Sequence, residues 1–249
     1  MTHSVLITGV TGTGGIGAAL VQAFADAGYR VIATGQNDQF EGVGASTYIK
    51  LDLQGFLDNP RTANQFAKEV RVAADGAPLS VLVNNAATQI VKPFDNVTAS
   101  DLATSLAINV IAPFALSKEF KSDLGAARGT IINIGSVHAQ ASKPRFSAYA
   151  TSKAALHGLT RSLAIDLGPE IRVNTLAPAA TATSMLKDGF AGDEEGLQEL
   201  KNYHPIGRIA TPEEISKIAV LMASGGMAFM TGTTIYADGG ILSRLHDPV

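Results

Sequence analysis

The sequence predicts an α/β fold: a single domain over residues 1–249, built on a doubly wound parallel sheet of about seven strands with helices on both faces. Two observations carry this prediction. Short β-branched and apolar runs alternate with longer helical patterns along the chain. Apolar residues make up 46% of the sequence and charged residues only 16%, so a chain of this length can bury a large core.

The expected strands share a near-continuous apolar character, which is typical of strands that are covered on both faces. They are Ser4–Thr8, Arg30–Thr34, Tyr48–Leu51, Ser80–Asn84, Gly129–Ile134, Ile171–Leu176 and Thr234–Ala237. The expected helices are Gly15–Ala27, Thr62–Ala74, Thr98–Leu124, Tyr149–Leu167 and Thr211–Ala223. Capping-box patterns mark the starts of the third and the fifth of these helices.

Two stretches do not fit the helical pattern. Gly35–Thr47 contains Gly42 and Gly44, so we expect the second crossover to be a loop. Met185–Pro205 reads as irregular and follows the sixth strand, at the edge where ligands enter such folds. We interpret residues 185–205 as a mobile substrate lid, with a plain surface excursion as the alternative.

Composition excludes several classes of function. A formal charge of −3, with scattered lysines and arginines, gives no surface for nucleic acid. The absence of cysteine excludes disulfides and thiolate metal sites, and no metal is expected. The first residues lack the basic region of a signal peptide, and no apolar run approaches the roughly 20 residues that span a bilayer. We therefore expect a cytoplasmic protein without a membrane partner.

A glycine-rich turn, Thr8-Gly9-Val10-Thr11-Gly12-Thr13-Gly14-Gly15-Ile16-Gly17, lies between the first strand and the first helix. Glycines let the backbone turn tightly and approach a pyrophosphate, while the helix start supplies free N–H groups. The context of strand, glycine turn and helix indicates a Rossmann-type dinucleotide site. An incidental glycine-rich turn is the alternative.

Tyr149 and Lys153 lie four residues apart at the start of a predicted helix and project from one face. Ser136 follows the fifth strand, so all three meet at the carboxyl edge of the sheet, beside the glycine turn. A free phenol has a pKa of about 10. An ammonium about 4 Å away at an effective dielectric near 20 contributes roughly 4 kcal/mol, which corresponds to a lowering of at most about three pKa units. We predict that Tyr149 is a general acid and base.

Asn109 lies in the third predicted helix, four residues before Pro113. Because proline has no N–H, the carbonyl of Asn109 loses its helical donor. That carbonyl is then free to hold a water molecule. A simple helix kink at Pro113 is the alternative.

These motifs together resemble the short-chain dehydrogenase/reductase family over nearly the whole chain. The resemblance implies a serine–tyrosine–lysine–asparagine set of catalytic residues, here Ser136, Tyr149, Lys153 and Asn109. The family pattern T-G-x-x-x-G-x-G matches three glycines, although the loop is two residues longer here, and N-N-A-G and N-x-x-x-P-G-x-x-x-T match with alanine in place of glycine. The implied cofactor contacts are Gly9, Gly15, Ile16, Gly17, Gln36, Asp52, Asn85, Ala86, Tyr149, Lys153, Pro178 and Thr183.

The resemblance implies NAD or NADP as cofactor, and Lys153 together with the oxidised nicotinamide is expected to bring the Tyr149 pKa into working range. An acid after the second strand would favour NAD and an arginine NADP, but this chain has Gly35-Gln36-Asn37 there. Since no cation lies in the glycine turn either, we lean towards NAD.

Three polar residues are expected to line a substrate pocket: Gln89, His138 and Arg145. Gln89 and His138 match positions that bind the carboxylate in 3-hydroxybutyrate dehydrogenases, which suggests a hydroxy or keto acid. A basic residue that those enzymes carry is Phe146 here. For His138 a water-exposed loop position is the alternative.

The predicted function is thus oxidoreduction of a small-molecule carbonyl or alcohol. A catalytically silent nicotinamide-binding sensor is the main alternative, and a methyltransferase leaves the catalytic set unexplained. The helices Thr98–Leu124 and Tyr149–Leu167 carry apolar residues on more than one face. We therefore expect self-association, and the family resemblance implies a homotetramer.

Overall fold

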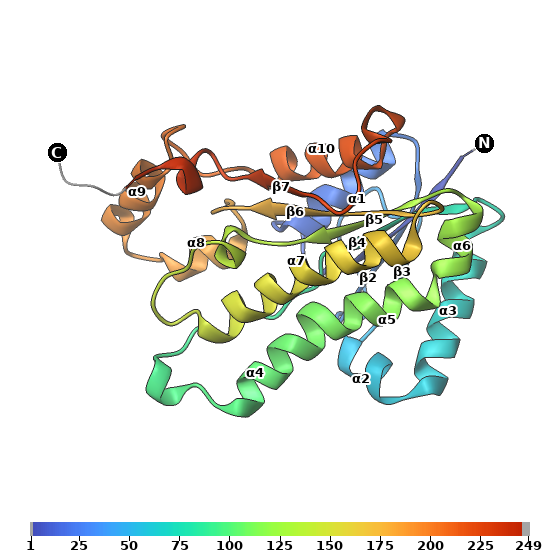
Figure 1. The fold of residues 1–249 in the computed structure, drawn as a ribbon, viewed down its shortest axis with the longest axis horizontal. Coiled ribbons are helices and arrows are strands. Elements are labelled where there is room, and N and C mark those ends of the chain that lie inside the picture. Colours follow the sequence, from blue (N-terminus) through green and yellow to red (C-terminus); the bar gives the residue numbers. More distant parts are fainter. Residues whose placement is uncertain (1, 246–249) are drawn as a thin grey trace.

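The computed structural model describes residues 2–245, so Met1 and residues 246–249 of the expected domain lie outside the described part. Seven parallel strands form one sheet in the order β3-β2-β1-β4-β5-β6-β7, with helices on both faces (Figure 1). The strands are β1 (Ser4–Thr8), β2 (Arg30–Gly35), β3 (Thr47–Lys50), β4 (Leu79–Asn84), β5 (Thr130–Ile134), β6 (Arg172–Pro178) and β7 (Thr234–Ala237). The predicted fold class and strands are confirmed, with ends that differ by one or two residues.

The helices differ more from the prediction. They are α1 (Ile16–Asp26), α2 (Leu53–Asp58), α3 (Pro60–Ala74), α4 (Ala99–Leu106), α5 (Ala112–Glu119), α6 (Lys121–Ala126), α7 (Ser147–Leu167), α8 (Ser184–Gly189), α9 (Glu194–Tyr203) and α10 (Pro212–Ala223). The sequence did not predict α2. The expected helix Thr98–Leu124 is divided by a π turn, Ala107–Ile111, and by a break at Phe120. The β2–β3 crossover is a loop, as predicted.

The prediction that Met185–Pro205 has no regular secondary structure is wrong. Two helices, α8 and α9, occupy it, and side-chain oxygens of Thr183 and Asp193 cap their first turns. The caps compensate for the glycines in this stretch, because each one satisfies an amide N–H that would otherwise be exposed.

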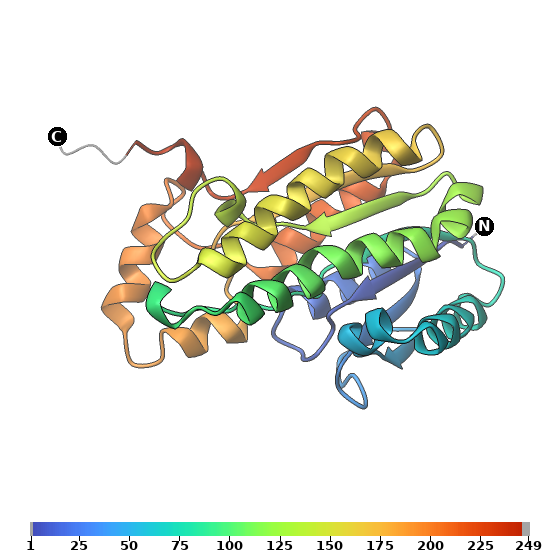
Figure 2. The same cartoon turned by 60° about the horizontal axis from the view of Figure 1, so that its bottom comes forward.

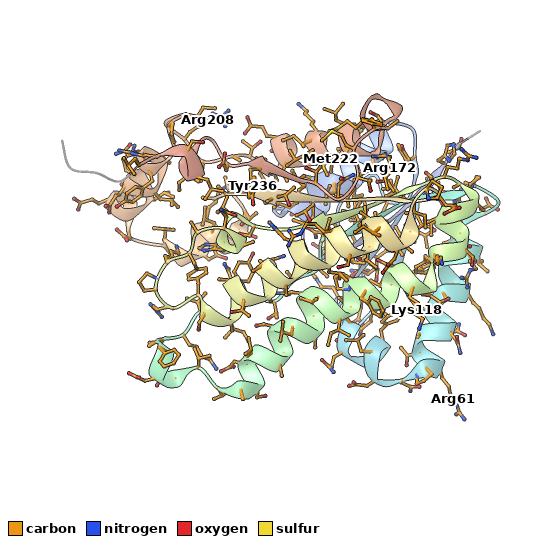
Figure 3. All side chains as sticks on the ribbon, in the orientation of Figure 1. Arg61, Lys118, Arg172, Arg208, Met222 and Tyr236 are labelled. Atoms are coloured by element: carbon orange, nitrogen blue, oxygen red, sulfur yellow. The ribbon has the colours of Figure 1, made fainter. Side chains whose placement is uncertain are left out.

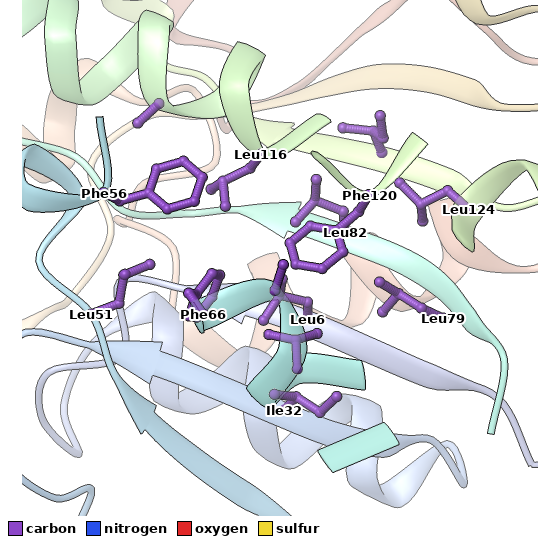
Figure 4. Close-up of a cluster of buried hydrophobic side chains, with 14 of the residues drawn as sticks. Leu6, Ile32, Leu51, Phe56, Phe66, Leu79, Leu82, Leu116, Phe120 and Leu124 are labelled. Atoms are coloured by element: carbon purple, nitrogen blue, oxygen red, sulfur yellow. The ribbon is translucent and has the colours of Figure 1, made fainter. Parts of the chain in front are cut away.

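Two separate cores cover the faces of the sheet, because successive strand residues point to opposite sides. On β1, Leu6 packs with α3, α5 and α7, whereas Val5 and Ile7 pack with α1 and α10. Figure 4 shows the first core, in which the rings of Phe66 and Phe120 meet edge to face 6.2 Å apart.

Arg172, at the start of β6, connects this strand to α10 and to the loop that follows it. Its guanidinium donates to the carbonyl of Met222 at the end of α10 and to those of Met227 and Met230. Figure 3 labels Arg172 and Met222 side by side. These hydrogen bonds hold α10 and the loop that leads to β7 against β6, so α10 covers the second core.

One continuous helical stretch among the described residues, Ala99–Glu119, is long and apolar enough by length and composition to cross a membrane. The sequence analysis excluded such a run and is corrected here. The finding is weak evidence for a membrane span, since helices of soluble proteins pass the same test. Here Ala112 and Leu116 of this stretch are buried in the first core.

Candidate active site

A cleft of about 2050 Å³ opens at the carboxyl edge of the sheet. In Figure 2 the strand arrows point towards this edge, where α8 and α9 lie. The order of strands reverses between β1 and β4, and ligands of such folds bind at this switch point. Every predicted site residue except Asn109 lines the cleft: Gly9, Gly15, Ile16, Gly17, Gln36, Asp52, Asn85, Ala86, Gln89, Ser136, His138, Arg145, Tyr149, Lys153, Pro178 and Thr183.

Two glycines of the turn after β1 cannot carry a side chain. Gly9 has a φ of +75°, and a Cβ there would lie 2.5 Å from the Cα of Ala86. A Cβ at Gly17 would lie 2.6 Å from the carbonyl oxygen of Gly9. The turn therefore packs backbone against backbone, which is the close approach that a pyrophosphate site requires.

The two additional residues of this turn reach across the cleft. Gly12 has no atom within 4 Å of where its Cβ would be, so this part points into open space. The carbonyl of Gly14 accepts a hydrogen bond of 3.2 Å from the backbone N–H of Ser184, at the start of α8. The lengthened turn is thus joined to Ser184, the residue that precedes the segment 185–205 predicted as a lid.

The start of α1 has the features of an anion-binding site. Its N-cap is Gly15, with an extended backbone, no capping side chain and no acid in the first turn. By contrast, Thr98 and Thr211 cap α4 and α10 within complete capping boxes. The first N–H groups of α1 remain available for a phosphate, and the helix dipole adds partial positive charge. These residues fit a dinucleotide cofactor.

Asn85 and Ala86, predicted as cofactor contacts, hold the glycine turn in place. The Asn85 side chain donates to the carbonyls of Thr8 and Gly9 at 2.9 and 3.1 Å. The backbone N–H of Ala86 donates to the Thr8 hydroxyl at 3.1 Å. The turn between β1 and α1 is therefore braced from β4, which keeps its shape independent of a ligand.

Just after β2 and β3, Gln36 and Asp52 contact each other. The Gln36 amide donates to the Asp52 carboxylate at 3.3 Å, and the same carboxylate caps α2 by accepting from Gly55 at 3.0 Å. The nearby cation Lys50 is paired with Asp38 at 2.6 Å. That ion pair explains why this end offers no free positive charge.

The three catalytic candidates converge in the cleft. Ser136 caps the short turn Val137–Ala139, accepting from the backbone N–H of His138 at 3.2 Å. Lys153 is buried, and its ammonium donates to the carbonyl of Ile134 at 2.7 Å. The Lys153 nitrogen lies 5.6 Å from the centre of the Tyr149 ring.

Burial governs the ionisation of these groups. It raises the pKa of the Tyr149 phenol above its usual value, and interaction with the Ser136 hydroxyl opposes this. Burial also lowers the pKa of Lys153 to about 8. The sequence analysis expected the lysine, together with an oxidised nicotinamide, to lower the phenol pKa. Within the described residues the loss of hydration raises that pKa, and the lowering by lysine and nicotinamide together stays a prediction.

Asn109 is buried and does not line the cleft. Its amide nitrogen donates to the carbonyl of Thr88 and to the hydroxyl of Ser152, and its amide oxygen accepts from the N–H of Thr88. The side chain is therefore occupied in joining the loop after β4 to α7. The π turn Ala107–Ile111 surrounds it, in which the N–H of Ala112 reaches the carbonyl of Ala107. A role of the Asn109 carbonyl in holding water stays a prediction.

The predicted substrate residues form an aromatic wall and an exposed edge. His138 stacks on Phe146, with ring centres 4.5 Å apart, and approaches Tyr149 edge to face. Burial, with a smaller effect of Lys143, lowers the pKa of His138 to about 4, so the ring is neutral at pH 7. Gln89 and Arg145 are exposed. His138 therefore brings no positive charge to a substrate.

The segment after β6 also meets the cleft. Thr183, predicted to contact the nicotinamide, caps α8 by accepting from Leu186 at 3.2 Å, and Pro178 ends β6 beside it. Both residues are placed at the edge that the prediction requires.

Sequence reasoning missed three ionisable residues that line the cleft: Lys143, His204 and Arg244. His204 is buried, its Nδ1 contacts the carbonyl of Leu200 at 2.8 Å, and its Nε2 has no partner among residues 2–245. His204 and Arg244 carry no motif, because they enter the cleft only through the return of the chain after α9 and β7, whereas Lys143 lies in the loop before α7, two residues from the predicted Arg145. In the same range no three His, Asp or Glu side chains gather as metal ligands.

Comparison with known proteins gives consistent results. A family model described as enoyl-(acyl carrier protein) reductase matches residues 9–242. Protein FixR of Bradyrhizobium diazoefficiens is 34% identical over 250 residues, which cover 94% of this chain and 85% of that protein.

Two solved structures are similar over their whole length. Ligand-free aldohexose dehydrogenase of Thermoplasma acidophilum has a TM-score of 0.90 and 28% identity, covering 100% of this chain and 97% of that one. A gluconate 5-dehydrogenase of Burkholderia cenocepacia, in complex with NADP and tartrate, has a TM-score of 0.84 and 25% identity, with 98% and 96% covered.

Proposed function

Because the chain belongs to the short-chain dehydrogenase/reductase family of oxidoreductases, we propose that it interconverts a carbonyl compound and a secondary alcohol, with Tyr149 as the general acid and base. The observation that carries this proposal is the convergence of Ser136, Tyr149 and Lys153 on the cleft that also contains the uncapped start of α1. Proton transfer and dinucleotide binding then occur at one edge of the sheet.

The ionisation of the site supports reduction at neutral pH. When bound, the nicotinamide supplies or accepts the hydride. The raised pKa of Tyr149 keeps the phenol protonated, so it can donate a proton to the carbonyl oxygen of a substrate. The Ser136 hydroxyl lies beside the phenol and can donate to the same oxygen. For oxidation the phenol must lose its proton, which added positive charge near Lys153 favours.

Lys153 has a second task in the proposal. Its pKa of about 8 leaves the ammonium charged at neutral pH, and its bond to Ile134 fixes it beneath Tyr149. From that position it supports the deprotonated phenol and reaches the cofactor ribose.

We propose that NAD binds at least as well as NADP. Gln36 is neutral, and Lys50, the cation near the end of β2, is already paired with Asp38. A 2′-phosphate would therefore lack a free cationic partner.

The deciding experiment is a nicotinamide absorbance assay with a panel of ketones and secondary alcohols, run with both cofactors. We expect turnover of at least one compound, and turnover about 10²–10⁴-fold lower in Tyr149→Phe. Tight binding of a cofactor without turnover on any compound would instead support a cofactor sensor.

The proposal includes a homotetramer in the cytoplasm. Ile111 and Phe114, on the α4–α5 stretch, are 50% and 45% exposed, and Ile165 on α7 is 81% exposed. An apolar surface on two adjacent helices favours contact with a second copy. Light scattering at micromolar concentration should give four times the chain mass, and a monomer would contradict this part.

A further inference from the structure

The charged residues that line the cleft are almost all positive. They are Asp52, Lys143, Arg145, Lys153 and Arg244. The chain carries 22 acids and 19 lysines and arginines, yet Asp52 is the one acid in this lining, at the ribose end beside Gln36. The cleft is therefore opposite in charge to the molecule as a whole, and its substrate end attracts anions.

Three exposed cations at this end come from two distant parts of the chain. Lys143 and Arg145 precede α7, whereas Arg244 follows the turn Ile241–Ser243 near the described C-terminus. None of the three has a carboxylate within ion-pair distance among residues 2–245. No carboxylate of the described residues neutralises their positive charge, so these cations are available to bind an anionic ligand.

Arg244 is held in place by a neutral partner. One guanidinium nitrogen, Nη1, donates to the carbonyl of Asn202 in α9 at 2.6 Å. A guanidinium has five N–H donors, so this single bond leaves a planar pair for an oxyanion. The bond also fixes the C-terminal turn against the helix predicted as part of the lid.

Arg145 is held by an unusual backbone. Its φ is +76°, a left-handed conformation that is uncommon for any residue but glycine. The carbonyl of Arg145 accepts from the backbone N–H of Lys92 at 3.1 Å, and the Lys92 side chain pairs with Asp101 at 2.7 Å. Such strain persists where surrounding contacts enforce it, and it is often found at ligand sites.

Beside Lys143 the wall of the cleft is aromatic. Phe146 stacks on His138, and the Lys143 ammonium lies 4.7 Å from the centre of the Phe146 ring. Phe146 and His138 both approach Tyr149, with ring centres 6.1 and 5.9 Å away. The carbon skeleton of a substrate can pack on these rings while its carbonyl faces Tyr149 and its charged end faces the cations.

We propose that the substrate carries an oxyanion, a carboxylate or a phosphate ester, which Arg145 and Arg244 bind while Tyr149 acts on a carbonyl or alcohol of the same molecule. This inference rests on the proposed function and adds its substrate class. Both oxyanions suit a guanidinium, which binds two of their oxygens at once.

The test compares pairs of compounds that differ only in charge. Oxo acids of four to six carbons are assayed against their methyl esters, and dihydroxyacetone phosphate against dihydroxyacetone. We expect the wild type to reduce at least one charged compound with a kcat/KM about tenfold above that of its neutral partner. Which pair shows this distinguishes a carboxylate from a phosphate substrate. Raising the salt concentration should narrow the difference.

Variants then assign the effect to the two arginines. Arg244→Gln and Arg145→Gln should each lower, about tenfold, the ratio of kcat/KM for the charged compound to kcat/KM for its neutral partner. Arg61→Gln is the matched control, because Arg61 is exposed at the start of α3 and does not line the cleft. Equal losses on charged and neutral compounds would overturn the inference.

Failure of the inference and of the proposed function can be told apart. If neutral carbonyl compounds react as well as the charged ones, the enzyme is an oxidoreductase and the inference is wrong. If no compound reacts, the same pairs are titrated calorimetrically into the complex with NADH. Binding of the acids that the two variants abolish supports the inference, and an absence of acid binding contradicts it. A protein that binds no nicotinamide cofactor contradicts the proposed function itself.

Discussion

The two ends of the cleft are constructed in different ways. The cofactor end is made of backbone: Gly9 and Gly17 touch neighbouring main chain, and Asn85 braces the turn with two hydrogen bonds. The substrate end is made of exposed side chains from separate segments, above all Arg145 and Arg244. Backbone geometry suits a ligand that never changes, whereas loop side chains suit one that differs between members of a family.

The two ends also meet at identifiable points. Lys153 lies beneath Tyr149 in the cleft that also contains the start of α1, and Gly14 is bonded to Ser184 at the start of α8. Changes at these junctions should affect both ends, and changes elsewhere should affect only one. The predictions below test this division, from the largest expected effect to the smallest.

Lys153→Ala should have the largest effect, because it removes the cation that serves both ends. We expect kcat/KM to fall at least a hundredfold, and cofactor binding to weaken as well. Steady-state kinetics and calorimetric titration of NADH measure the two effects. Loss of turnover with unchanged cofactor affinity would confine Lys153 to the proton-transfer role.

Two histidines should make stability fall in acid. Burial lowers the pKa of His157 and of His138 to about 4. A depressed histidine pKa means that the unfolded chain binds more protons between about pH 6.5 and 4, so the free energy of unfolding falls as the pH drops through that window. For the buried His157 the loss amounts to at most about 3 kcal/mol, and for the half-buried His138 to less.

Urea denaturation at a series of pH values measures how the free energy of unfolding depends on pH. His157→Leu should reduce the fall in the free energy of unfolding between about pH 6.5 and 4 more than His138→Leu does. Equal reductions would mean that the substrate end is as well shielded from water as the core beneath it.

Gly17→Ala should damage the cofactor end alone. The added methyl would meet the Gly9 carbonyl oxygen at 2.6 Å, which should cost about 1–3 kcal/mol of stability or distort the turn. NADH affinity should fall with it. Gly12→Ala is the control, because its methyl meets open space. Two variants with equal NADH affinity, measured calorimetrically, would contradict the backbone account of this end.

Gln36→Arg should have a smaller effect, on cofactor preference. The new guanidinium gives a 2′-phosphate a bidentate partner, so the ratio of NADPH to NADH affinity should rise about tenfold, which corresponds to about 1.4 kcal/mol. Fluorescence titration of both cofactors measures this. A wild type that already prefers NADPH clearly would refute the proposed NAD preference.

The same division explains what the sequence could predict. The strands and the glycine turn are local patterns, so their positions followed from residues close together in the chain. Helix α2 was missed because it is short, contains Gly55 and depends on a cap from Asp52, which was read only as a cofactor contact. Helices α8 and α9 were missed because their glycines outweighed the caps at Thr183 and Asp193.

The candidate site also combines residues that are close in the sequence with residues that only the tertiary fold brings together. Tyr149 and Lys153 share a helix face, and their spacing predicted their proximity. Arg244 and His204 reach the cleft through tertiary folding, which leaves no local pattern to read. The Tyr149 pKa shows the same limit, because it is raised by the burial of the phenol, which the spacing of residues does not give. Its lowering by Lys153 together with an oxidised nicotinamide stays a prediction.

The most direct test of the central claim is Tyr149→Phe, measured on a compound that the wild type reduces. The exchange removes only the hydroxyl, so the fold and the cofactor affinity should be preserved. We predict that kcat falls by about 10²–10⁴-fold, the range typical of general acid–base catalysis, while the dissociation constant of NADH is unchanged. A variant with near-normal turnover would contradict the assignment of Tyr149 as the proton donor.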